Sequence, residues 1–482
     1  MTSPFDLVVI GSGPAGQKAA LNAAKLGKRV ALIDRADSLG GVCIHTGTIP
    51  SKAIREAVLH LTGMQLRQVY GESYSVKSDI TMGDLLYRAN HVMRTETEVI
   101  RNQMRRNHVS VFSGTAAFVD AHTLRVTCDD QAIDVRGHHV LIAVGTEPAR
   151  PASVPFTPDR VIDSTELLSL TKLPKSCAIV GGGVIGTEYA CMLAAVGVKV
   201  TLIESRPKLL EFVDDELIEA LQFRLRDNGV RLRLGEVVAD IELSDTEVVA
   251  TMNSRKQVHA DLLLYCIGRQ GATDRLNLAA AGLSADNRGR LSVNEHYQTS
   301  VSHVYAAGDV IGFPALAATS MEQGRQASSH MFGQYTESTP SLFPFGIYTI
   351  PEISMVGQTE QQLTAAAVPY EVGIARYREI ARGQLIGEPH GLLKILFHPV
   401  SRRVLGVHTF GTGATELVHI GQTVMAAGMP IDYFVDTVFN YPTLAECYKV
   451  AALDGINRVR AGAGSDAAPA EVSAESPLPL AA

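Results

Sequence analysis

The sequence lacks the residue runs that mark several large classes of protein. No stretch of 18 uninterrupted apolar residues occurs, which argues against a membrane-spanning helix. Long runs of Lys or Arg are also missing and the formal net charge is −7, which argues against nonspecific nucleic-acid binding. The opening residues, Met-Thr-Ser-Pro-Phe-Asp, contain no basic segment of the kind that begins a secretory signal. We therefore expect a cytoplasmic protein with no nucleic-acid or membrane partner.

The cysteines are few and scattered. They stand at positions 43, 128, 177, 191, 266 and 447. Zinc ligands usually occur in close pairs such as Cys-x-x-Cys, and this chain has no such pair. We expect no metal, and we expect most of these thiols to be buried in a reducing compartment.

What the sequence does contain is an internal repeat at an offset of 170 residues. Residues 8–34 run from Val-Val-Ile-Gly-Ser-Gly-Pro-Ala-Gly to Val-Ala-Leu-Ile-Asp, and residues 178–204 run from Ala-Ile-Val-Gly-Gly-Gly-Val-Ile-Gly to Val-Thr-Leu-Ile-Glu. Such apolar runs are typical of buried parallel strands. Each copy therefore predicts a strand, a glycine turn, a helix and a second strand. Gly27 and Gly197 stand where a helix often ends on a residue with positive φ.

Glycines and a terminal acid give each copy the spacing of a dinucleotide-binding fingerprint. The first glycine makes a tight turn, the second lets a pyrophosphate approach the backbone, and the third lets helix and strand pack closely. The acid that follows is placed to accept hydrogen bonds from a ribose 2′-hydroxyl. One fingerprint is weak evidence, but two in the same context predict two dinucleotides. The residues are Gly11, Gly13, Gly16 and Asp34 in the first copy and Gly181, Gly183, Gly186 and Glu204 in the second.

With five further motifs the chain resembles the two-dinucleotide-binding-domain flavoproteins, the class-I pyridine nucleotide-disulfide oxidoreductases. The resemblance covers about residues 5–460. It implies that the first fingerprint holds FAD, that the second holds NAD(H) or NADP(H), and that the chain forms a homodimer or a higher homo-oligomer. The motifs are Gly-Gly-Val-Cys at 40–43, Ile-Pro-Ser-Lys at 49–52, Ala-Val-Gly-Thr at 143–146, Cys-Ile-Gly-Arg at 266–269 and Val-Tyr-Ala-Ala-Gly-Asp at 304–309.

The resemblance implies an α/β fold with two Rossmann-like dinucleotide-binding domains and a C-terminal α+β dimerisation domain. The FAD-binding domain is expected to be discontinuous, over residues 1–150 and 276–343, with the NAD(P)-binding domain at 151–275. The interface domain is expected at 344–462. Residues 463–482 are rich in Ala, Gly, Ser and Pro, and we expect this tail to be disordered.

Candidate site residues also follow from the resemblance. Lys52 and Glu188 are expected to pair beside the reactive nitrogen of the flavin, where a cation favours anionic reduced flavin. Arg206 follows Glu204 and offers a guanidinium to a 2′-phosphate, so that one site would accept both NADH and NADPH. The alternative is that Arg206 is a solvated loop charge. The residues expected to bind FAD are Gly11, Ser12, Gly13, Pro14, Ala15, Gly16, Asp34, Arg35, Gly40, Gly41, Cys43, Lys52, Gly145 and Asp309, and those expected to bind the nicotinamide nucleotide are Gly181, Gly183, Val184, Ile185, Gly186, Glu204, Arg206 and Gly268.

Two departures separate the chain from the disulfide reductases of this family. Those enzymes carry a second cysteine five residues after the first, where this chain has Thr48 after Cys43. They also carry His-Pro-Thr followed by Glu, where this chain has Tyr441 and then Glu446. A threonine hydroxyl forms no disulfide, and a phenol is a poor base near neutral pH. These four positions are the remaining candidate catalytic residues.

The same departures occur in the soluble, Si-specific transhydrogenase branch of the family. The resemblance therefore implies an oxidoreductase that moves hydride between NADPH and NAD⁺ through FAD, by a ping-pong mechanism and without a redox-active disulfide. Such a transfer requires stacking, orientation and a dry site, and it needs neither of the missing groups. Two alternatives stay open: an NAD(P)H diaphorase with a quinone-like acceptor, and a noncatalytic flavin-binding redox sensor.

Overall fold

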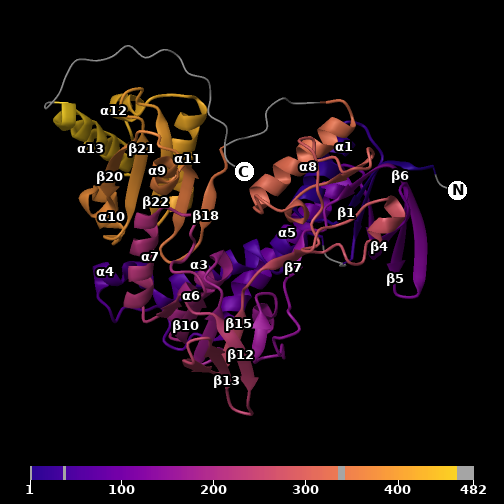
Figure 1. The fold of residues 1–482 in the computed structure, drawn as a ribbon, viewed down its shortest axis with the longest axis horizontal. Coiled ribbons are helices and arrows are strands. Elements are labelled where there is room, and N and C mark those ends of the chain that lie inside the picture. The colour runs from indigo at the N-terminus through magenta and orange to yellow at the C-terminus, as the bar shows by residue number, and fades with distance from the viewer. Residues whose placement is uncertain (1–2, 36–38, 335–341, 464–482) are drawn as a thin grey trace.

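The computed structural model describes residues 3–35, 39–334 and 342–463, and in it the chain forms three lobes (Figure 1). The lobe on the right of the figure contains β1 and β6, the lower lobe contains β10 and β15, and the lobe on the upper left contains β21 and α13. The expected disorder of the C-terminal tail falls on residues 464–482, which lie outside the described residues.

The first lobe is built on a seven-stranded sheet. Its order is β3-β2-β1-β6-β5-β4, with β17 beside β6. The long strand β6 pairs in parallel with β1 through residues 137–142 and antiparallel with β5 through residues 131–136, so one strand joins a parallel and an antiparallel half. The strands are β1 (Phe5–Ile10), β2 (Val30–Asp34), β3 (Ser110–Ser113), β4 (Thr115–Asp120), β5 (Thr123–Cys128), β6 (Gln131–Ile142) and β17 (Val304–Ala306).

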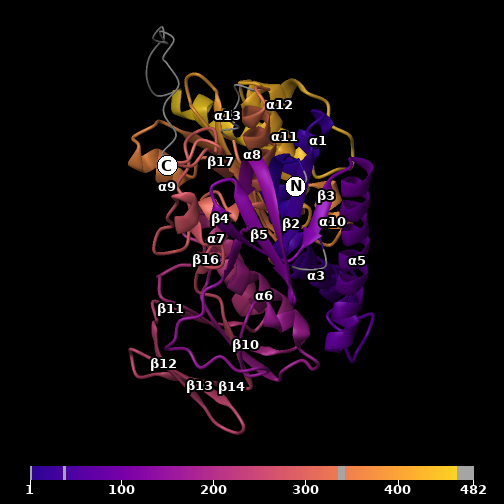
Figure 2. The same ribbon diagram turned by 90° about the vertical axis from the view of Figure 1, so that its right-hand side faces the viewer.

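Helices cover this first sheet. Helix α8 packs directly on α1, and the two lie side by side in both ribbon views (Figures 1 and 2). Gly324 makes this approach possible, because a Cβ there would collide with the carbonyl oxygen of Ala15. The helices on this sheet are α1 (Pro14–Lys25), α2 (Gly41–His45), the second half of α5 (Met82–Arg106) and α8 (Ala317–Met331), whereas α3 (Thr48–Thr62) and the first half of α5 pack in the core of the second lobe, with α4 (Arg67–Tyr70) following α3.

The second lobe repeats the parallel design. Its sheet has the order β11-β10-β9-β15-β8, with all pairs parallel. An antiparallel sheet β12-β13-β14 flanks it, and the short pair β7–β16 joins the first two lobes. The elements are β7 (Thr146–Pro148), β8 (Val161–Asp163), β9 (Ser176–Val180), α6 (Val184–Ala195), β10 (Lys199–Glu204), α7 (Asp215–Asp227), β11 (Arg231–Leu234), β12 (Val238–Leu243), β13 (Val248–Met252), β14 (Gln257–Ala260), β15 (Leu262–Tyr265) and β16 (Arg269–Gly271).

Both copies of the repeat fold as the sequence predicts. Helix α1 begins and ends 170 residues before α6 does. The turn glycines Gly11 and Gly181 have φ of +101° and +111°, and Gly27 and Gly197 end the two helices with φ of +75° and +89°. A Cβ on Gly16 would collide with the carbonyl oxygen of Gly11, and the third glycine of the second copy meets the same restriction. The two Rossmann-like units are therefore confirmed.

The C-terminal lobe is an α+β unit with an antiparallel sheet of order β18-β19-β22-β21-β20. Strands β21 and β22 are almost wholly buried between helices, as in a core sheet. No helix in the described part of the chain is long and apolar enough to cross a membrane. The elements are β18 (Phe345–Ile347), β19 (Ile353–Gly357), α9 (Glu360–Ala365), β20 (Glu371–Arg376), α10 (Ala381–Leu385), β21 (Leu392–Phe397), β22 (Val404–Phe410), α11 (Ala414–Ala426), α12 (Asp432–Asp436) and α13 (Glu446–Ala463).

Candidate active site

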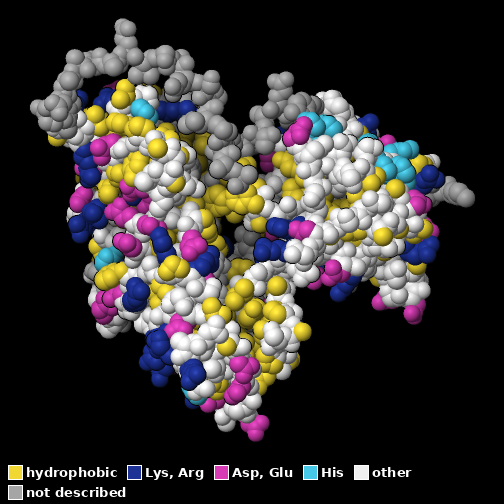
Figure 3. Space-filling view, viewed as in Figure 1, with side chains coloured by type: hydrophobic (Ala, Val, Ile, Leu, Met, Phe, Trp, Pro, Cys, Tyr) yellow, Lys and Arg dark blue, Asp and Glu magenta, His cyan; other side chains and the backbone are white. Residues whose placement is uncertain are grey.

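The first fingerprint opens into a pocket built from segments far apart in the sequence. Among the described residues, the pocket is lined only by residues 10–146 and 272–320, and the space-filling view shows a hollow with charged side chains on its walls between the two upper lobes (Figure 3). A Cβ on Gly13 would meet only open space, which leaves room for a phosphate at the start of α1. The lining includes Gly11, Ser12, Gly13, Pro14, Ala15, Asp34, Arg35, Gly41, Cys43, Thr48, Gly145, Thr146, Arg275, Asp309 and Ser320.

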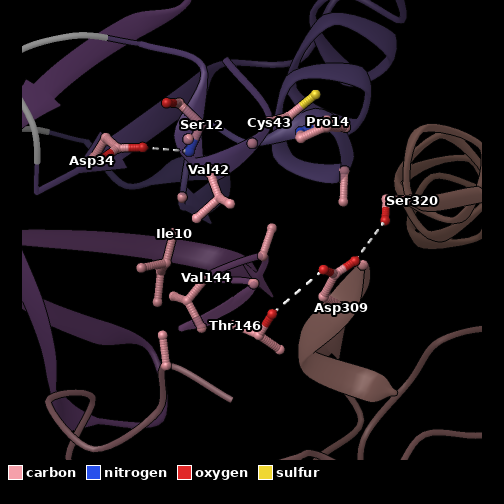
Figure 4. A pocket seen from close by; sticks show the side chains of 18 of the residues that line it. Ile10, Ser12, Pro14, Asp34, Val42, Cys43, Val144, Thr146, Asp309 and Ser320 are labelled. Atoms are coloured by element: carbon pink, nitrogen blue, oxygen red, sulfur yellow. Dashed lines mark hydrogen bonds between the residues drawn. The ribbon is translucent and has the colours of Figure 1, made fainter. Parts of the chain in front are cut away.

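Two carboxylates point into this pocket from opposite sides (Figure 4). Asp34 Oδ2 accepts the backbone N–H of Ser12 at 2.7 Å, which holds the acid at the end of β2. Asp309 accepts long hydrogen bonds from Thr146 Oγ1 at 3.4 Å and from Ser320 Oγ at 3.5 Å. Hydrogen bonds this long are weak, so Asp309 retains acceptor capacity for a ligand hydroxyl.

Two residues expected at FAD, Gly40 and Gly16, do not line the first pocket, and a third, Arg35, lines it but is ion-paired. The N–H of Gly40 donates to Ser12 Oγ at 2.9 Å and supports the turn from outside the pocket lining. Gly16 packs inside the turn rather than facing the pocket. Arg35 lines the pocket and forms an ion pair with Glu147 at 2.5 Å.

The second pocket lies at the second fingerprint and is built entirely from residues 153–268. Of the residues expected at the nicotinamide nucleotide, its lining includes Gly181, Gly183, Glu204, Arg206 and Gly268, but not Gly186. A Cβ on Gly183 would again meet open space. Val184 and Ile185 pack against the hydrophobic core at the start of α6 and are not part of this lining.

The acid of the second pocket is saturated with hydrogen bonds. Glu204 Oε2 accepts the N–H of Gly182 at 2.6 Å, and both carboxylate oxygens accept from the Arg206 guanidinium at 3.0 Å. Burial raises the pKa of Glu204, but the bonds from Arg206 and from Gly182 outweigh it and lower the pKa to about 2. Arg206 is thus a partner of the acid as well as a wall of the pocket, and not merely a solvated loop charge.

Lys52 and Glu188 meet although 136 residues separate them. Lys52 Nζ donates to Glu188 Oε1 at 2.9 Å and to Oε2 at 2.7 Å. The Glu188 side chain is only 5% exposed and that of Lys52 is 25% exposed, so the ion pair is largely shielded from water. Lys52 was expected at FAD but is not part of the first pocket's lining; it lies one helical turn after Thr48, which is, so the pair stands next to that pocket.

Cys43 and Thr48 also lie together in the first pocket. The pKa of Cys43 is raised, because burial disfavours the thiolate more than the hydrogen bond with Thr48 favours it. All six cysteines lie in the described part of the chain, and all are free thiols. A thiol with a raised pKa is a poor nucleophile, so a passive role fits Cys43 best.

Tyr441 and Glu446 lie in the C-terminal lobe and do not reach the first pocket of their own chain. Tyr441 is 74% exposed, in the segment between α12 and α13. Glu446 begins α13, and its Oε2 is buried with no hydrogen-bond partner among the described residues.

Several pocket residues were not predicted from the sequence. Thr146 and Ser320 make long hydrogen bonds to Asp309, and Arg275 adds a cation to the first pocket. Thr146 belongs to the Ala-Val-Gly-Thr motif at 143–146, so this motif could have identified it as a candidate. Tyr348 contacts both Lys52 and Glu188. Sequence reasoning did not single it out, because an aromatic residue beside a strand is typical of a hydrophobic core.

Comparison with known proteins agrees with this geometry. Residues 5–324 match the family described as pyridine nucleotide-disulphide oxidoreductase, and residues 343–452 match its dimerisation domain. Soluble pyridine nucleotide transhydrogenase of Mycobacterium tuberculosis is 54% identical over 461 residues, 95% of this chain and 98% of that protein. The protein of the same name from Yersinia enterocolitica is 46% identical over 460 residues, 94% and 98% of the two chains.

Solved structures give the same result. The flavoprotein disulfide reductase RclA of Escherichia coli superposes with a TM-score of 0.84 at 29% identity, over 93% of this chain and 99% of that one. LpdA of Mycobacterium tuberculosis superposes with a TM-score of 0.85 at 26% identity, over 93% and 99%. Fold and sites define a two-nucleotide flavoprotein. The chain belongs to the pyridine nucleotide-disulphide oxidoreductase family, and its C-terminal lobe is the dimerisation domain of that family.

FAD is the cofactor of this chain, with NAD(P)(H) as substrates, and the residues present fit these groups. Both fingerprints leave open space beside the second glycine, where a pyrophosphate would approach the helix. The first pocket adds Asp309, with its spare acceptor capacity, for hydroxyls of the flavin side chain.

Proposed function

We propose that this chain is an FAD-dependent transhydrogenase that moves hydride between NADPH and NAD⁺ without a redox-active disulfide. The observation that carries the proposal is Thr48, which occupies the disulfide position and lies beside Cys43 in the first pocket. A hydroxyl does not replace a thiolate as an electron carrier. Electrons therefore have no route beyond the first pocket, and the donor and the acceptor nucleotide use the same second pocket in turn.

The residues of the first pocket bind and orient the cofactor. Helix α1 presents its N-terminal N–H groups to a pyrophosphate, Asp34 accepts from a ribose, and Asp309 accepts from the ribityl chain. When bound, FAD supplies a carrier that takes up a hydride from one nicotinamide and returns it to another. Lys52, held by Glu188, provides a fixed positive charge at this site and stabilises negative charge as it develops.

The second pocket must accept two nucleotides that differ by one phosphate. Glu204 suits the ribose 2′-hydroxyl of NADH, and Arg206 suits the 2′-phosphate of NADPH. Because the two side chains bind each other in this structure, each nucleotide has to displace one partner of the same ion pair. We infer that this shared cost keeps the two affinities close, as a transhydrogenase requires.

We further propose a homodimer in which Tyr441 of one chain caps the first pocket of the other. Support comes from the exposure of Tyr441 and from the match to the dimerisation domain. A cytoplasmic location is proposed from the relatives, whose names call them soluble.

Two anaerobic experiments test the proposal. Titration with NADPH should bleach the flavin directly, with no long-wavelength thiolate band, whereas the matched variant Thr48→Cys should gain that band. A band in the wild-type protein would overturn the thiol-free route. The rate with thio-NAD⁺ should also exceed the rate with a quinone, and the reverse order would favour a diaphorase. Absence of bleaching by either NADH or NADPH would favour a redox sensor.

A further inference from the structure

Tyr348 belongs to the C-terminal lobe and lies against the Lys52–Glu188 pair. It follows β18 directly, and its backbone N–H donates to Glu188 Oε1 at 2.8 Å. Its ring lies under the Lys52 ammonium, with Nζ 4.8 Å from the ring centroid. One residue therefore contacts both members of the ion pair, through its backbone on one side and its ring on the other.

The ring of Tyr348 lies beside Thr415, whose hydroxyl donates to Glu352 Oε2 at 2.8 Å. Gly346 leaves room for this arrangement, because a Cβ there would lie 3.2 Å from Thr415 Cγ2 and 3.4 Å from the ring of Tyr348.

The chain of contacts returns to the helix on which it began. Glu352 Oε1 forms an ion pair with Arg55 Nη2 at 3.2 Å, and Arg55 Nε donates to the carbonyl oxygen of Thr349 at 3.0 Å. Lys52 and Arg55 stand three residues apart on α3, so they lie on neighbouring turns of one face. The segment 348–352 thus contacts α3 at two residues, Lys52 and Arg55.

We propose that Tyr348 is a positioning residue for hydride transfer, holding the Lys52 ammonium in place. The face of an aromatic ring attracts a cation and restricts its sideways movement. The N–H bond to Glu188 withdraws negative charge from that carboxylate, which leaves more of the field of Lys52 directed at the first pocket. The dimerisation domain would then set the electrostatics of the flavin site as well as join subunits.

This inference rests on the role proposed for Lys52, and a double-mutant cycle separates the two. The test uses the FAD-loaded dimer and measures the rate of flavin reduction by NADPH in stopped flow, together with KM. Tyr348→Leu should reduce the rate roughly tenfold and leave KM unchanged. Tyr348→Phe keeps the ring and the amide and should retain at least half of the wild-type rate. In a Lys52→Met background, Tyr348→Leu should cause no further loss.

The outcomes distinguish the two claims. If Lys52→Met alone leaves the rate unchanged, the role of Lys52 is wrong. If Lys52→Met slows reduction but Tyr348→Leu does not, or if the two losses simply multiply, the inference about Tyr348 is wrong. Tyr370→Leu is the matched control, since that hydroxyl bonds Thr364 in the same domain and should not affect the rate. Tyr348→Met has a longer and more flexible side chain that fills the space of the ring differently, and it replaces Tyr348→Leu if the latter loses FAD or folds poorly.

Discussion

The two nucleotide pockets share one backbone design and differ in what surrounds it. Both have a glycine turn with positive φ, an open second glycine and a helix of equal length. The first pocket is closed by segments from residue 10 to residue 320, whereas the second uses only residues 153–268. A site closed by many distant segments releases its ligand only when several contacts open together. The comparison therefore assigns retention to the first pocket and exchange to the second.

The acids of the two pockets, Asp34 and Glu204, also differ in their hydrogen-bond partners. Both acids accept a backbone N–H, from Ser12 to Asp34 and from Gly182 to Glu204, but Glu204 also binds the guanidinium of Arg206, a side chain that is 42% exposed. A backbone partner stays in place when a ligand binds, but a side-chain partner can leave. Exchange between two nucleotides is thus favoured in the second copy of the repeat, where Arg206 can leave Glu204 when a ligand binds.

The largest expected effects come from adding a methyl group to each third glycine. Gly16→Ala and Gly186→Ala introduce the same collision with a turn carbonyl, so they are matched variants of the two pockets. We expect Gly16→Ala to be isolated without flavin, because its turn no longer binds the pyrophosphate. Gly186→Ala should retain flavin absorbance and lose at least 100-fold in flavin reduction by NADPH. Loss of flavin from both variants would contradict the division of roles.

A second prediction concerns the buried ion-pair cluster that joins the lobe of the second pocket to the C-terminal lobe. Lys394 is fully buried and binds Asp214 at 2.8 Å, Glu216 at 3.1 Å and also Glu360. Removing one partner of such a cluster leaves uncompensated buried charge, so Lys394→Met should cost about 3–5 kcal/mol of unfolding free energy. Denaturant unfolding followed by fluorescence measures this loss. Flavin should remain bound under native conditions, and a stability change below about 1 kcal/mol would contradict the prediction.

A third prediction concerns the choice between nucleotides. Arg206→Ala should raise KM for NADPH roughly 10- to 100-fold, since a hydrogen bond between charged groups contributes about 1.5–3 kcal/mol. KM for NADH should stay the same or fall, because Glu204 no longer has to release a partner. The matched control is Lys208→Ala, whose ammonium binds Asp215 at 2.7 Å and should affect neither nucleotide. Steady-state kinetics with equal losses for both nucleotides would refute the proposed role of Arg206.

The smallest effect is a pH dependence of stability. The pKa of Glu204 is about 2 in the folded protein, against an ordinary value of 4.5. A lowered pKa means that the ionised carboxylate stabilises the fold above pH 4.5 and that this contribution is lost as the pH falls toward 2. The difference in Tm between wild type and Glu204→Gln should therefore narrow on going from about pH 6 to about pH 3. A difference that does not change with pH would show that Glu204 is not the group responsible.

The backbone of both pockets could be predicted because glycine position and strand periodicity are local properties. Helices α1 and α6 begin directly after Gly13 and Gly183, as the fingerprint requires. The contact of Lys52 with Glu188 came from family resemblance, since no local pattern joins residues 136 positions apart. Tyr348 and the ion pair of Arg206 with Glu204 depend on side-chain geometry, which periodicity does not encode. The same limit explains why Val184 and Ile185 were expected in a pocket whose lining does not include them.

The central claim is that one pocket serves as both entrance and exit for hydride, with no thiol beyond the flavin. Double-mixing stopped flow under anaerobic conditions tests it most directly: one equivalent of NADPH first, then thio-NAD⁺ with increasing NADP⁺. The account predicts full bleaching by one equivalent, full reoxidation, and competitive slowing of reoxidation by NADP⁺. Reoxidation that NADP⁺ does not affect, or bleaching that needs two equivalents, would contradict it.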